Sequence, residues 1–123
     1  EMGLPFIYVR SASKGHGLQN MIEGEFHSGQ RVVVIEDLIS TGGSSLKAVE
    51  ALRDANCNVL GLSAIFSYGF QLAEDNFKNA KCPYFTLSNY DVLIEQAAKE
   101  NYVSEKDLES LKNWKSNPEN WNQ

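Results

Sequence analysis

Four short apolar runs alternate along the chain with stretches whose apolar residues recur at helical spacing. The second run is apolar on both faces, which is typical of a buried parallel strand. Pro5 stands at the start of the first run, where its missing N–H donor costs least. The pattern predicts four core strands, at residues 4–9, 31–35, 59–66 and 84–87.

The stretches after the second, third and fourth runs carry the periodicity of amphipathic helices. Ser104 and Asp107 resemble a capping box, which predicts one helix start. The predicted helices are residues 44–55, the segment with Phe70, Ala73 and Phe77 on one face, a helix that begins at Asn89, and a last helix with Leu108 and Leu111. Because strands alternate with helices, we expect an α/β fold with a parallel sheet.

The second predicted strand leads into two carboxylates, a glycine-bearing turn and a helix. Glu36 and Asp37 come at the carboxyl end of this strand, where open α/β sheets bind ligands. Residues 40–44 are small or hydroxylated, so backbone N–H groups can close around an anion such as a terminal phosphate monoester. We expect Ser44 or Ser45 to cap the helix that follows.

The carboxylate pair suits two kinds of ligand. The carboxylates can accept hydrogen bonds from a vicinal diol, or they can reach a divalent cation directly or through water. A merely solvated acidic strand end is the alternative interpretation. The small, hydroxylated loop that follows the pair disfavours it.

Residues 10–17, Arg-Ser-Ala-Ser-Lys-Gly-His-Gly, interrupt the apolar pattern. Glycines flank His16, which is typical of a mobile loop. Lys14 and a protonatable His16 can stabilise negative charge on a leaving group. A solvated loop with three ordinary basic residues is the alternative. The position of this loop one strand before the carboxylate pair favours the functional interpretation.

Composition narrows the class of protein. The chain has 123 residues, 42% of them hydrophobic and 22% charged, which fits one modest globular domain. Its formal net charge of −5 argues against a nucleic-acid or membrane-surface role. Cys57 and Cys82 match no metal or redox spacing, and the sequence has no pattern of a membrane span or signal peptide. We therefore expect a reducing, cytoplasmic location.

The segment 33–44, Val-Val-Ile-Glu-Asp-Leu-Ile-Ser-Thr-Gly-Gly-Ser, resembles the phosphoribosyl-pyrophosphate (PRPP) signature of the type I phosphoribosyltransferases. The resemblance implies a Rossmann-like parallel-sheet core. It also implies that the acidic pair holds the ribose hydroxyls and that the loop cradles the 5-phosphate. The PRPP-binding residues implied here are Glu36, Asp37, Leu38, Ile39, Ser40, Thr41, Gly42, Gly43 and Ser44.

The basic loop, with Arg10, Lys14 and His16, is similar to the flexible catalytic loop of the orotate phosphoribosyltransferases. Residues 65–70 and 86–90 also resemble segments of one bacterial branch of that family. In that family the loop closes over pyrophosphate and serves the neighbouring subunit. The resemblance implies that Lys14 and His16 are catalytic, that all three basic residues bind PRPP, and that the protein is a homodimer.

The same resemblance implies a reaction. The 5-phosphoribosyl group of PRPP would pass to orotate with inversion at the anomeric carbon, giving orotidine 5′-monophosphate and pyrophosphate in pyrimidine biosynthesis. Mg²⁺ is the implied cofactor, with no direct protein ligand. Ser40 corresponds to the residue that touches orotate in relatives. Ser11 stands where some members carry a second basic residue, and Tyr68 stands about where some carry an arginine that binds the orotate carboxylate.

Members of this family have a long part before the position of Leu4, which supplies a hood over the base and the strand and loop that grip pyrophosphate. We therefore interpret residues 1–123 as a partial, N-terminally truncated phosphoribosyltransferase domain that we expect to be inactive alone. Two other functions stay open, a type I phosphoribosyltransferase for a purine base and a non-catalytic PRPP-binding regulator. Lys14 and His16 count against a regulator, which needs no such loop. We expect Trp114 to pack or fray rather than to stack on a base.

Overall fold

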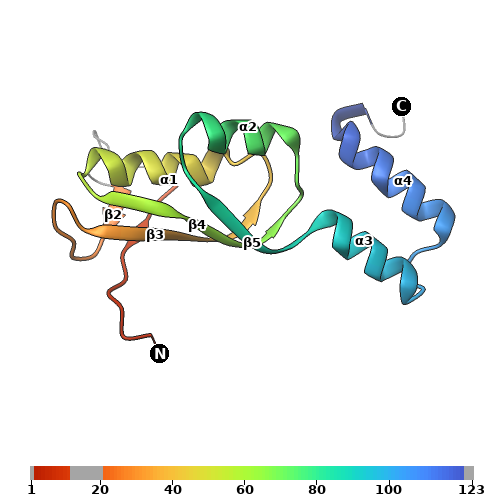
Figure 1. The fold of residues 1–123 in the computed structure, drawn as a ribbon, viewed down its shortest axis with the longest axis horizontal. Helices are drawn as coiled ribbons and strands as arrows, with labels where there is room; N and C mark the ends of the chain where they lie inside the picture. Colours follow the sequence, from red (N-terminus) through yellow and green to blue (C-terminus); the bar gives the residue numbers. More distant parts are fainter. Residues whose placement is uncertain (1, 12–20, 121–123) are drawn as a thin grey trace.

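The computed structural model describes residues 2–11 and 21–120, so Lys14 and His16 lie outside the described residues. Strands alternate with helices from β3 to α3, as the sequence predicts (Figure 1). In chain order the elements are β1 (Tyr8–Val9), β2 (Ile22–Glu23), β3 (Arg31–Ile39), α1 (Gly43–Asp54), β4 (Asn58–Ser67), α2 (Gln71–Asn79), β5 (Tyr84–Asn89), α3 (Tyr90–Lys99), α4 (Glu105–Ser116) and the 3-10 helix η2 (Pro118–Asn120).

A parallel sheet in the order β3–β4–β5 forms the centre of the fold. Its strands end side by side, because Ile39 at the end of β3 pairs with Ser67 of β4, and Ser67 pairs with Asn89 of β5. Ligands of open α/β sheets bind at this carboxyl edge. The residues that follow β3 and β4 therefore emerge next to each other.

The predicted first strand, residues 4–9, does not join this sheet. Only Tyr8 and Val9 are strand residues, and they pair antiparallel with β2. A cavity of about 590 Å³ lies between residues 2–9 and the edge of β3. Among the described strands β3 pairs only with β4. Residues 4–7 lie across this cavity from the free edge of β3 without pairing with it, so the parallel sheet has three described strands instead of the predicted four.

Helices α1 and α2 lie on the same face of the sheet (Figure 1). The core between these helices and the sheet contains Val34, Ile39, Val49, Leu52, Leu62, Ala64, Ala73 and Phe77. Because strand residues alternate between faces, the neighbours of the buried strand residues point the other way. In the described part of the chain that opposite face is exposed and carries Val33, Ile35, Ile65, Phe85 and Leu87.

Helices α3 and α4 form a hairpin beyond the carboxyl end of the sheet (Figure 1). The Asn89 side chain caps α3 by accepting the backbone N–H of Val92 at 3.1 Å. Ser104 and Asp107 form the predicted capping box at the start of α4. Both predicted helix starts are confirmed. None of the helices described is long and apolar enough to cross a membrane.

The core predicts a large stability effect at Phe77, which is 1% exposed. We expect Phe77→Ala to lower the free energy of unfolding by about 3–5 kcal/mol, through lost burial and the cavity left behind. Leu72→Ala, at an exposed position of the same helix, should change it by less than about 0.5 kcal/mol. Urea denaturation followed by circular dichroism measures both values. Equal losses in the two variants would contradict the described packing of α2.

Candidate functional site

Glu36 and Asp37 lie within β3 rather than after it, because the strand continues to Ile39. The predicted end of the strand was too early, since the ladder with β4 extends past the carboxylates and places Glu36 opposite Ala64. Successive strand residues project to opposite faces of a sheet. The two carboxylates therefore lie on opposite sides of β3, close to its carboxyl end.

The Glu36 carboxylate is half-buried on the side of α1. Burial raises the pKa of this carboxyl, a side-chain hydrogen bond with Ser45 lowers it, and the charge of Asp37 raises it. Ser45 is only 1% exposed and lies in the first turn of α1. The Ser45 hydroxyl thus bonds to Glu36 from the first turn of α1. The sequence analysis did not predict this contact.

Asp37 is exposed, and its Oδ1 accepts the backbone N–H of Leu38 at 2.7 Å. This contact orients the carboxylate and leaves its side chain open to solvent. A ligand that bridges both faces of the strand end can therefore meet one partly desolvated and one solvated carboxylate. The hydroxyls of a vicinal diol fit such a pair, because each can donate to a carboxylate oxygen.

Residues 40–42 connect β3 to α1 and end in a left-handed turn. Gly42 is the N-cap residue of α1, with φ +80°, and no side chain that the structure describes caps the helix. The predicted serine cap is therefore wrong, because Ser45 bonds to Glu36 and Ser44 lies exposed in the first turn. That turn also contains no acidic residue. Unbonded N–H groups at a helix N-terminus without a side-chain cap attract an anion.

Two residues of helix α2 contact this loop and fix its position. The Asn76 amide donates a hydrogen bond to the backbone carbonyl of Thr41 at 2.9 Å. A Cβ atom on Gly42 would lie 2.7 Å from the Phe77 ring, so only glycine fits there. Asn76 and Phe77 are functional neighbours that the sequence analysis did not identify. Their contact with a loop 35 residues away leaves no local signal in the sequence.

Arg10 lies in the other part of the predicted site. Its guanidinium forms an ion pair with Glu23 of β2, and its backbone N–H donates to the Met21 carbonyl at 2.7 Å. These contacts join Arg10 to residues 21–23. Lys14 and His16, which belong to that segment, lie outside the described residues, so the structure does not place them relative to the carboxylates.

Ser40 is exposed at the start of the loop, and Tyr68 lies beside it in space. The backbone N–H of Tyr68 donates to the carbonyl of Ile39 at 3.1 Å. The Tyr68 ring, however, stacks on Phe70 and contacts Trp114. Tyr68 is therefore part of an aromatic cluster. Of the two outcomes expected for Trp114, packing and fraying, the structure shows packing.

The two carboxylates fit a magnesium ion only if other groups supply the rest of its oxygen ligands. Within the described residues no group of three or more histidine, cysteine, aspartate or glutamate side chains could hold a metal. Mg²⁺ commonly binds through one or two carboxylates while the substrate and water supply its other oxygens. Glu36 and Asp37 match that requirement, directly or through water, without forming a metal site of their own.

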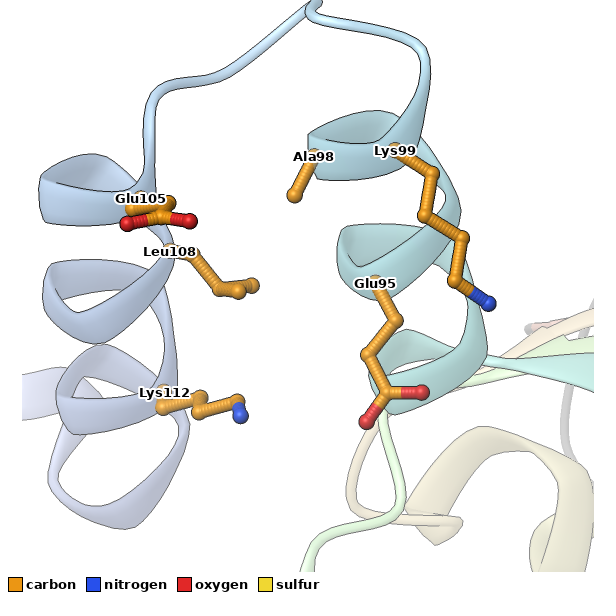
Figure 2. Close-up of a pocket in the computed structure, with 6 residues that line it drawn as sticks. All are labelled: Glu95, Ala98, Lys99, Glu105, Leu108 and Lys112. Atoms are coloured by element: carbon orange, nitrogen blue, oxygen red, sulfur yellow. The ribbon is translucent and has the colours of Figure 1, made fainter.

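A second hollow, of about 370 Å³, lies between α3 and α4 and is smaller than the cavity beside β3. Figure 2 shows its walls, with Ala98 and Leu108 facing across the gap and charged side chains around them. Glu95 and Lys99 come from α3, and Glu105 and Lys112 come from α4. Because acidic and basic groups balance here, the hollow lacks the positive field that a phosphate ligand requires.

No protein-family model matches the chain, but comparison with known proteins finds similar sequences and structures. The orotate phosphoribosyltransferase of Cytophaga hutchinsonii is 58% identical over 120 residues, which cover 98% of this chain and 57% of that protein. The orotate phosphoribosyltransferase of Bacteroides thetaiotaomicron is 53% identical with the same coverage. The chain thus spans a little over half the length of these curated relatives.

Solved structures show the same fold. Leishmania donovani UMP synthase matches with a TM-score of 0.77 and 26% identity, over 94% of this chain and 24% of that one. Mycobacterium tuberculosis orotate phosphoribosyltransferase, solved in complex with Fe(III) dicitrate, matches with a TM-score of 0.58 and 34% identity, over 68% of this chain and 47% of that one. The same enzyme in complex with PRPP matches with a TM-score of 0.56 and 30% identity, over 68% of this chain and 46% of that one.

The parallel sheet, the carboxylate pair and the loop at the start of α1 define the class of this protein as a type I phosphoribosyltransferase fold. The fold class predicted from the sequence is confirmed. Within that class the chain is similar to the orotate phosphoribosyltransferases, because curated relatives of that name are more than half identical to it over nearly its whole length.

The buried environment of Glu36 predicts a pH-dependent effect on stability. Since the pKa of Glu36 is raised in the folded protein, ionisation of this group opposes folding. Its favourable contribution is complete below the pKa of the unfolded chain and is lost as the pH rises through the folded pKa. We therefore expect Glu36→Gln to raise the melting temperature at about pH 7 and to have a smaller effect at about pH 4.

Thermal denaturation at both pH values checks this expectation, with Glu50→Gln as the control at an exposed carboxylate of α1. The control should show no such pH-dependent gain. A Glu36→Gln variant that is less stable than the parent chain at neutral pH would contradict the role assigned to burial.

Proposed function

We propose that the protein carrying this chain is an orotate phosphoribosyltransferase and that this chain holds the ribose 5-phosphate part of its PRPP site. One arrangement carries the proposal: a carboxylate pair on β3 leads within a few residues to an uncapped helix N-terminus, in a chain 58% identical to a relative of that name. The alternative of a purine-base enzyme rests on the resemblance of segment 33–44 to a signature that the type I phosphoribosyltransferases share.

The ribose and phosphate would be bound from two sides of the loop. Glu36 and Asp37 accept hydrogen bonds from the ribose hydroxyls. The backbone N–H groups at the start of α1, together with the exposed hydroxyls of Thr41 and Ser44, donate to the 5-phosphate. Each of these contacts positions the sugar. None of them makes a covalent bond to it.

In the proposed reaction the bond between the anomeric carbon and pyrophosphate breaks, and a bond to orotate N1 forms on the opposite face. Lys14 and His16 offset the charge of the departing pyrophosphate, and His16 can also donate a proton to it. Arg10 would exchange its ion pair with Glu23 for a phosphate oxygen. Mg²⁺, when bound with PRPP, would supply further charge neutralisation.

The assembly and location belong to the same proposal. We expect a homodimer, in which the basic loop of one subunit reaches the site of the other, as the family resemblance implies. A cytoplasmic location agrees with two cysteines, Cys57 and Cys82, that are both buried free thiols.

The base specificity is tested with a panel of bases. We expect the expressed gene product that contains this chain to consume PRPP with orotate and to release pyrophosphate, and to do so far more slowly with adenine or hypoxanthine. Pyrophosphate release, followed by a coupled assay, measures each rate. Consumption of a purine base but not of orotate would replace the proposal by the purine-base alternative, and PRPP binding without any turnover would favour a regulator.

The basic loop predicts a separation between turnover and binding. Lys14→Ala should lower kcat by about 10²-fold or more while the affinity for PRPP changes little, because Lys14 acts on charge that develops as the bond breaks. Asp37→Asn should instead weaken the affinity for PRPP more than it lowers kcat, because Asp37 contacts the ribose already in the ground state. Steady-state kinetics and calorimetric titration with PRPP measure the two quantities. Undiminished turnover in Lys14→Ala would rule out the loop assignment.

A further inference from the structure

A cluster of aromatic rings joins the C-terminal hairpin to the end of β4. The Trp114 ring of α4 lies 5.6 Å from the ring of Tyr68, 5.8 Å from that of Phe70 and 5.0 Å from that of Tyr90, between centroids. Tyr68 in turn stacks on Phe70 at 5.5 Å with an interplanar angle of 16°. The segment that follows β4 and the first residue of α3 thus meet around one tryptophan of α4.

Helix α4 also makes polar contacts with α3. None of its residues is fully buried. The Tyr90 hydroxyl donates to the Leu111 carbonyl at 3.2 Å, and Lys115 forms an ion pair with Asp91 at 2.6 Å. Both polar contacts go to the first turn of α3. Trp114 is therefore the residue whose ring brings α4 against the segment that follows β4, and the Lys115 side chain lies beside Gly69 of the same segment.

That segment, residues 68–70, lies next to the candidate site. The Tyr68 N–H donates to the carbonyl of Ile39, the residue immediately before Ser40. The Gly69 N–H donates to the Ser67 hydroxyl at 3.0 Å, and Ser67 is itself 5% exposed. A displacement of the Tyr68 backbone would therefore move the first residue of the loop.

The rest of the loop is held by other residues. Asn76 and Phe77 of α2 contact Thr41 and Gly42, and none of these contacts involves α4. Different residues therefore contact the two ends of the loop. Helix α2 contacts the end at Thr41 and Gly42, and Tyr68 contacts the residue before Ser40. Loss of Trp114 should disturb one end and spare the other.

We propose that Trp114 is a positioning residue, which holds Tyr68 against the end of β3 and thereby sets the position of Ser40 on the base side of the site. The assignment of that side to the base rests on the proposed transferase function. The proposal also has a mechanical part, the support of the Tyr68 backbone by a ring on α4. This mechanical part does not rest on the proposed function.

The mechanical part is tested by hydrogen exchange of the 123-residue chain. In Trp114→Ala we expect the Tyr68 and Gly69 amides to exchange about tenfold faster or more, while the Leu62 and Ala64 amides within β4 keep their rates. Trp114→Phe should restore most of the protection, because a smaller ring still covers Tyr68. Lys112→Ala, at an exposed position of α4, is the matched control and should leave all four rates unchanged.

Unaltered exchange at Tyr68 in Trp114→Ala would overturn the proposal. A uniform increase across β3, β4 and β5 would also overturn it, because Trp114 would then support the whole fold rather than one loop.

The functional part is tested by kinetics of the gene product that contains this chain. Trp114→Ala should raise the KM for orotate about fivefold to tenfold and leave the KM for PRPP within about twofold, with recovery in Trp114→Phe. An equal rise of both KM values would contradict separate support of the two ends. If the parent protein lacks this activity, the proposed function fails, and the exchange rates alone then decide the role of Trp114.

Discussion

The fold around the site depends on the close approach of Phe77 to Gly42. The left-handed Gly42 ends the loop and starts α1, and a side chain at that position would strike the Phe77 ring. This contact aligns α2 with the N-terminus of α1, and the Asn76 bond to Thr41 fixes the preceding residue. The backbone N–H groups that attract an anion are thus positioned by the hydrophobic core. Because the core packs before any ligand arrives, this part of the site is preorganised.

The carboxylates of β3 lie in the same region, and the folded structure there disfavours the charge of one of them. Burial and the charge of Asp37 both disfavour the ionised form of Glu36, and only Ser45 relieves this among the effects that act on its pKa. A chain selected for stability alone would carry a neutral residue there. A ligand hydroxyl that donates to Glu36 replaces part of its lost hydration. Under the proposed function, a ribose hydroxyl in contact with Glu36 would recover part of this cost as ligand affinity.

Local chemistry explains which features could be predicted from the sequence. The β-branched run, the acidic pair and the small loop are contiguous, so the strand, the loop and the following helix were all recognised. The serine cap was wrong because the helix starts earlier than predicted, with Gly42 as its N-cap, so Ser44 and Ser45 lie inside the first turn. The strand at residues 4–9 was wrong because a strand requires a partner, and an apolar pattern does not identify one. The contacts of Asn76, Phe77 and Trp114 depend on packing between distant segments, which periodicity cannot reveal.

Two helices from different parts of the chain support the two ends of one short loop. Helix α2 contacts the phosphate end through Asn76 and Phe77, and α4 reaches the Ser40 end through Trp114 and Tyr68. In the proposed site, substitutions in α4 therefore alter the Ser40 end of the loop more than the helix N-terminus at Gly42. The two supports still meet at one point, because the ring of Phe70, the N-cap residue of α2, lies 5.8 Å from that of Trp114.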